Sequence, residues 1–120
     1  MNITNTASKI FTKENSLIST KINEINLRKD ELGELKIQMV ITGFSRKSNY
    51  SKINLLFSDI IEFKFYYDHN YHFYNIENYK LLHIKDQIYI SFDPDETTPV
   101  KSENDSDLIF AKKLELSIIK

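Results

Sequence analysis

The chain has 120 residues, of which 41% are hydrophobic and 28% are charged, and its formal net charge is −1. This length and composition are typical of one globular domain, so we expect residues 1–120 to fold as a single unit. Cysteine is absent, which excludes disulfides, cysteine nucleophiles and cysteine-based zinc or iron–sulfur sites. The only two glycines are Gly33 and Gly43, so the chain has no glycine-rich phosphate-binding loop.

Charge is distributed unevenly along the chain. Residues 1–60 hold nine Lys/Arg and six Asp/Glu, whereas residues 61–120 hold seven and eleven. The overall balance lacks the basic surplus of a general nucleic-acid binder, so we expect no direct contact with nucleic acid. The first twenty residues lack the pattern of a secretion signal, and no apolar run approaches the ~20 residues of a membrane span. We therefore expect a cytoplasmic protein with no membrane partner.

The first 30 residues fit two patterns. Ile18, Ile22 and Ile25 follow a helical stripe, but the β-branched content favours a strand, and we expect the strand with a short N-terminal helix as an option. Residues 28–34 indicate a turn. Alternating residues from Leu35 to Ile41 then predict a strand that ends at Gly43.

The remaining chain alternates between apolar and polar residues at short intervals. We predict strands over residues 53–57 and 61–67, a weaker one over 72–76, a hairpin over 82–92 and a last strand over 114–118. Asp93-Pro94 ends the hairpin, because proline cannot donate to a strand ladder, and residues 93–107 form a loop. The pattern predicts an all-β protein, an antiparallel β-sandwich with a barrel as the alternative.

The predicted loop carries the densest charge. Its carboxylates can form a solvated flexible loop, a calcium site built on Asp93-x-Asp95 and Asp105-x-Asp107, or a surface for a basic partner. The EF-hand glycine and glutamate are missing, and we expect no metal and no cofactor. The candidate partner-binding residues of this loop are Asp93, Asp95, Glu96, Glu103, Asp105 and Asp107.

Histidines and aromatic residues are the other candidates. His69, His72 and His83 supply the residue types of a histidine-dependent ribonuclease, but their spacing selects no active site. Eight aromatic residues lie between residues 63 and 79, where the stretch is net negative, so we interpret them as core rather than as an RNA platform. Tyr66 and Tyr89 are expected to point outward and to anchor a protein partner.

A sequence resemblance covers about half of the chain. Its elements are Phe57-Ser58-Asp59-Ile60, Tyr79-Lys80-Leu81-Leu82, the run Ile88 to Pro94 with the acidic stretch after it, and Ala111-Lys112-Lys113. They resemble immunity proteins of bacterial polymorphic toxins and contact-dependent growth inhibition systems. The resemblance implies a non-enzymatic protein that binds one cognate toxin domain, often a nuclease, and blocks it.

We accordingly expect an immunity protein that occludes the active site of a basic nuclease toxin. The alternatives are a small carbohydrate- or calcium-binding β-sandwich module and a histidine-dependent ribonuclease.

Overall fold

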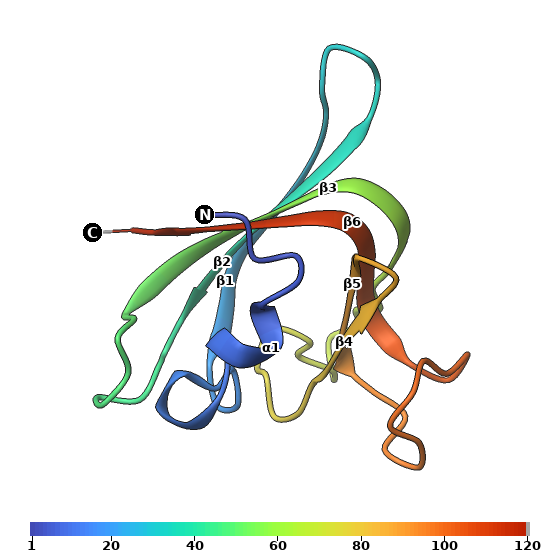
Figure 1. The fold of residues 1–120 in the computed structure, drawn as a ribbon. Helices are drawn as coiled ribbons and strands as arrows, with labels where there is room; N and C mark the ends of the chain where they lie inside the picture. The colour runs from blue at the N-terminus through green and yellow to red at the C-terminus, as the bar shows by residue number, and fades with distance from the viewer. Residues whose placement is uncertain (120) are drawn as a thin grey trace.

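The computed structural model describes residues 1–119 and contains one six-stranded antiparallel sheet (Figure 1). The strands follow the order β1-β2-β3-β6-β5-β4, so β1 and β4 form the two edges. The all-β class and the short N-terminal helix are confirmed. The elements are α1 (Ala7–Ile10), the 3₁₀ turn η1 (Lys13–Asn15), β1 (Lys21–Lys29), β2 (Leu35–Thr42), β3 (Lys52–Lys64), β4 (Lys80–Ile84), β5 (Gln87–Asp93) and β6 (Ser106–Ile118).

Alternation in the sequence sets the two faces of the sheet. The predicted inward residues of β2 and β3, such as Met39 and Leu55, are fully buried on the concave face. The predicted β4–β5 hairpin is also present. Its two turn residues, Lys85 and Asp86, both have positive φ (49° and 64°), which matches a type I′ turn and the right-handed twist of the strands.

The sheet bends sharply along β3 and β6, as Figure 1 shows. The pairing of these strands shifts between Ile60 and Glu62, and Asp59 has a φ of 53° beside this bulge. The two strands predicted over 53–57 and 61–67 are therefore one bent strand. The prediction that pairing continues to Tyr67 is wrong, because β3 ends at Lys64.

After β3, residues 65–79 leave the sheet instead of forming the strand predicted over 72–76. This segment turns back across the concave face, where Phe65, Phe73 and Ile76 join the main core. Its main chain also meets the start of β1, since the Ile22 N–H donates to the Tyr74 carbonyl at 2.8 Å. The assignment of the eight aromatic residues to the core is therefore only partly correct. Phe63, Phe65, Phe73 and Tyr79 pack against the core, whereas Tyr66, Tyr67 and Tyr74 are exposed.

We expected two packed sheets, and residues 1–119 form only one. The second layer consists of residues 65–79 and of the N-terminal segment, which contributes Ile3, Ala7, Phe11 and Leu17. The N-terminal residues also extend the sheet beside β6, where the Ile3 N–H donates to the Leu114 carbonyl at 2.9 Å. Because irregular segments bury this face, a sandwich is not needed to cover it.

Across residues 1–119, neither helical segment has the length and apolar character required to cross a membrane.

Candidate partner-binding surface

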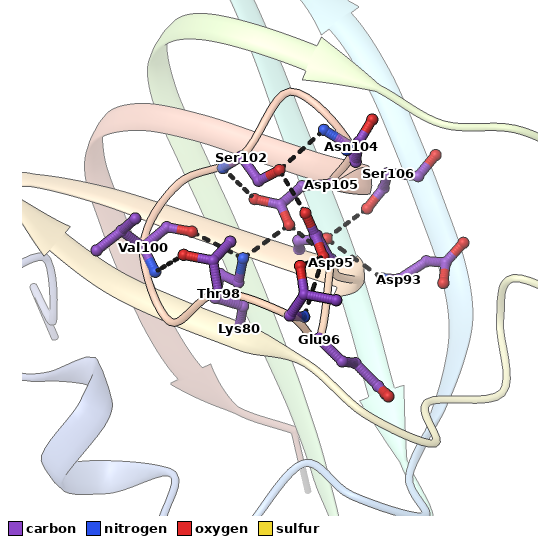
Figure 2. A network of polar contacts seen from close by, with 12 residues as sticks. Lys80, Asp93, Asp95, Glu96, Thr98, Val100, Ser102, Asn104, Asp105 and Ser106 are labelled. Atoms are coloured by element: carbon purple, nitrogen blue, oxygen red, sulfur yellow. Dashed lines mark hydrogen bonds and ion pairs between the residues drawn. The ribbon is translucent and has the colours of Figure 1, made fainter.

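The loop between β5 and β6 is ordered around one buried carboxylate, that of Asp105 (Figure 2). Asp105 accepts hydrogen bonds from the Lys80 ammonium at 2.8 Å and from the Tyr89 hydroxyl at 2.5 Å. It also accepts the backbone N–H groups of Asp95 (2.8 Å) and Ser102 (3.0 Å). Contacts of Asp105 with β4, β5 and the backbone of the loop therefore order this loop, although it carries many carboxylates.

Charge and burial compete at this carboxylate. Burial alone would raise the pKa of Asp105, but hydrogen bonds from Lys80, Tyr89 and the two backbone N–H groups outweigh it and lower the pKa below 3.8. Burial, followed by the hydrogen bond to Asp105, raises the pKa of the Tyr89 hydroxyl. The side chain of Lys80 is only 8% exposed, so Asp105 is the counterion that makes its burial tolerable.

Asp107 holds the other end of the loop. It accepts the Tyr66 backbone N–H at 2.9 Å and the hydroxyl of Tyr71. Burial, followed by this hydrogen bond to Asp107, raises the pKa of Tyr71. Asp107 thereby connects β6 to the start of residues 65–79.

Three of the predicted partner-binding residues are thus internal. Asp105, Asp107 and Tyr89 are fully buried, so they cannot contact a partner in this conformation. Tyr89 does lie on the face opposite Ile88 and Ile90, as alternation requires, but Leu108 and Phe110 pack against it there. Lys101 also lies 5.2 Å from the Phe110 ring centroid. We expected an outward tyrosine because the sequence does not show that the loop folds back over that face.

The other predicted residues remain accessible. Asp93, Glu96 and Glu103 are exposed and Asp95 is half-buried, while Tyr66 is 55% exposed and donates its hydroxyl to Asp68 at 2.6 Å. Hydrogen bonds from Thr97 and Ser102 lower the pKa of Asp95 to about 2. Asp95 is therefore ionised at neutral pH and adds negative charge to the surface.

A polar cleft of about 350 Å³ separates this acidic loop from the irregular segment. Its walls hold three exposed carboxylates, those of Glu77, Asp93 and Glu96. The lining residues include no lysine or arginine. Sequence reasoning missed Glu77, because it lies 16 residues before Asp93 and no local pattern links the two. The lining residues are Asn70, Tyr71, His72, Asn75, Glu77, Asn78, Phe92, Asp93, Pro94 and Glu96.

The loop carboxylates have partners that compete with calcium. Asp105 uses its oxygens for one ammonium, one hydroxyl and two N–H groups, and Asp95 accepts the hydroxyls of Thr97 and Ser102 at 2.6 and 2.7 Å. Calcium needs six to eight oxygen ligands, so binding it here would break this network. In the part of the chain that the structure describes, no three His, Cys, Asp or Glu side chains gather as a metal site.

The three histidines do not converge. His83 lies on β4 and fastens the N-terminal segment, with its ring nitrogens 2.9 Å from the Thr4 carbonyl and 2.9 Å from the Ser8 hydroxyl. His72 stacks on Tyr74 at 5.3 Å between centroids, and His69 is exposed in the 68–71 turn. His83 therefore connects β4 to the N-terminal segment.

Comparison of the chain with protein-family models, with curated proteins and with solved structures finds no match.

Proposed function

We propose that this protein is a non-enzymatic immunity protein that binds a basic toxin domain in the cytoplasm and blocks its active site. The observation that supports this proposal is the acidic cleft, whose rim carries Glu77, Asp93 and Glu96 and no lysine or arginine. A nuclease active site is basic because it binds phosphate, so a fixed group of carboxylates is complementary to it.

Pre-organisation strengthens this argument. A loop that is already ordered loses less conformational entropy when it binds than a flexible loop does. The buried Asp105 and Asp107 order both ends of the loop, so the exposed acidic side chains are presented from a fixed backbone. In this proposal the buried acids position the surface, and the exposed acids contact the partner.

The first test is growth rescue. The C-terminal domain of the protein encoded directly upstream is expressed in a sensitive host, with and without this protein. Rescue together with a purified one-to-one complex is expected. A toxic domain that this protein does not neutralise, or an upstream protein that is not toxic, would contradict the proposal.

The second test locates the interface. Replacing Glu77, Asp93 and Glu96 together with lysine should weaken the complex by at least tenfold and abolish its salt dependence, because the cleft changes from negative to positive. The matched control replaces three exposed acids elsewhere, Glu14, Glu31 and Glu34, with lysine and has the same net charge. Equal affinities for the two triple variants would place the interface away from the cleft.

A further inference from the structure

The edge strand β1 is open along most of its length. At its start, Lys21 and Ile22 pair with residues 74–75. From Glu24 to Lys29, within residues 1–119, the backbone has no partner on the side away from β2. The β1–β2 hairpin also projects beyond the rest of the molecule at the top of Figure 1. Natural proteins usually protect such an edge, because unpaired N–H and C=O groups bind other strands.

The register of the hairpin shows which groups are free. The Asp30 N–H donates to the Glu34 carbonyl at 2.9 Å, so the main chain of residue 30 faces β2. Because this direction alternates along a strand, the main chains of residues 24, 26 and 28 also face β2. The N–H and C=O groups of Ile25, Leu27 and Lys29 therefore point to the open edge.

The sequence at this edge, Glu24-Ile25-Asn26-Leu27-Arg28, is complementary to itself in the antiparallel direction. A two-fold axis at Asn26 places Glu24 opposite Arg28 of a second copy, and Ile25 opposite Leu27. The free main-chain groups of Ile25 and Leu27 then form the hydrogen-bonded pairs, so side-chain pairing and backbone pairing agree.

Neighbouring registers lack this agreement. An axis at Leu27 pairs Ile25 with Lys29 and places Glu24 opposite Asp30, which repel each other. An axis at Arg28 places two arginines opposite each other. The five residues 24–28 also fit the open length that starts after the contact of Ile22 with Tyr74.

A row of polar side chains on the outer face leads to the same axis. The Asn26 amide donates to Gln38 at 3.2 Å, Gln38 donates to Asn54 at 2.5 Å, and Asn54 donates to Ser117 at 3.4 Å. Asn26 lies at the end of this row, on the edge strand. Its side-chain oxygen, Oδ1, accepts no hydrogen bond from residues 1–119. Two Asn26 side chains meeting at the axis would each accept the second amide proton of the other.

We propose that β1 pairs with β1 of a second copy of this chain, antiparallel about Asn26, and joins the two sheets into one. On the concave face the pairing covers Leu27, which is 52% exposed in the single chain. An interface of this length is small, so the dimer forms in a concentration-dependent manner. None of the pairing residues 24–28 lines the acidic cleft, so this proposal does not depend on the proposed toxin.

Sedimentation velocity over a range of protein concentrations tests the proposal. Glu24→Arg and Arg28→Glu should each weaken the dimer by about tenfold, because each creates two like-charge pairs, and the double variant should restore it. Glu31→Arg and Lys47→Glu carry the same charge changes at exposed positions off the edge and should leave the dimer unchanged. A chain that stays monomeric at every concentration would overturn the proposal, as would a double variant as weak as the singles.

Two further variants keep the test independent of charge. Leu27→Pro removes an N–H group that faces the open edge and the leucine side chain that the pairing covers, but no hydrogen bond to β2. It should therefore abolish the dimer while circular dichroism and the urea midpoint show a folded monomer. Because the chain has no cysteine, Asn26→Cys places a single thiol at the axis and should form a disulfide-linked dimer under mild oxidation. The control Asn49→Cys, in the exposed β2–β3 loop, should remain monomeric. Equal crosslinking of the two cysteine variants would overturn the proposal.

Discussion

Replacing Asp105 with asparagine should remove a large part of the stability of the fold. The substitution keeps the shape of the side chain but removes the charge that neutralises Lys80, whose side chain is 8% exposed and whose ammonium lies 2.8 Å away. Removing one partner of a buried ion pair costs about 3–5 kcal/mol, because the other charge stays buried without compensation. Domains of this size have a free energy of unfolding of only about 5–15 kcal/mol.

Urea unfolding followed by circular dichroism measures this loss. With a slope of about 2 kcal/mol per molar urea, Asp105→Asn should lower the midpoint by roughly 2 M. Asp86→Asn is the matched control, because it makes the same chemical change at an exposed turn residue whose positive φ asparagine also tolerates. Its free energy of unfolding should differ from that of the parent chain by less than about 0.5 kcal/mol.

The pair itself is tested by a double-mutant cycle with Lys80→Met. The combined variant should be more stable than the sum of the two single losses predicts, because no uncompensated ammonium remains. A loss below about 1 kcal/mol for Asp105→Asn, or strict additivity in the cycle, would refute the argument that Asp105 is the required counterion of Lys80.

Three further predictions concern pH, the N-terminal segment and one glycine. The folded state lowers the pKa of Asp105, so the contribution of its carboxylate to stability is complete above the unfolded-state pKa and disappears as the pH falls through the folded-state pKa. The free energies of unfolding of the parent chain and of Asp105→Asn, measured by urea unfolding at several pH values, should therefore converge in acid. Parallel curves would contradict this prediction. His83→Ala removes the contacts to Thr4 and Ser8, so it should lower the free energy of unfolding by about 1–2 kcal/mol. It should also speed amide hydrogen exchange at Ala7 more than at Leu55, and uniform acceleration would contradict a local role. Gly43 has a φ of 85°, and an added Cβ would meet no atom closer than 3.6 Å. Gly43→Ala should therefore lower the free energy of unfolding by about 1 kcal/mol through backbone strain alone, as measured by thermal unfolding. An unchanged stability would refute this argument.

Strand content could be predicted wherever side chains alternate with a period of two. The inward residues of β2 and β5, for example Met39 and Ile90, were identified correctly because strand geometry sends successive side chains to opposite faces. The break predicted over residues 85–87 was found for the same reason, since it interrupts two alternating runs. The structure confines the turn to Lys85 and Asp86, because Gln87 already pairs with Ile84. Alternation failed between Phe65 and Ile76, where aromatic residues are spaced as in a strand but pack on the core from an irregular segment.

The candidate surface was predicted only in part. Counting charges locates the acidic loop, and Asp93, Glu96 and Glu103 are exposed as expected. It cannot distinguish them from Asp105 and Asp107, because all have the same side chain or nearly so and the difference arises from distant partners. Lys80 and Tyr71, which hold those two carboxylates, lie 25 and 36 residues away in the sequence.

Local sequence therefore decides the properties that depend on neighbouring residues: the all-β class, the faces of β2 and β5, the hairpin turn and the position of the acidic loop. The tertiary structure alone decides which acids are buried, that Glu77 joins Asp93 and Glu96 at one cleft, and that irregular segments take the place of a second sheet. The physical reason is that burial and charge pairing depend on contacts between residues far apart in the chain, whereas strand periodicity is a property of adjacent residues.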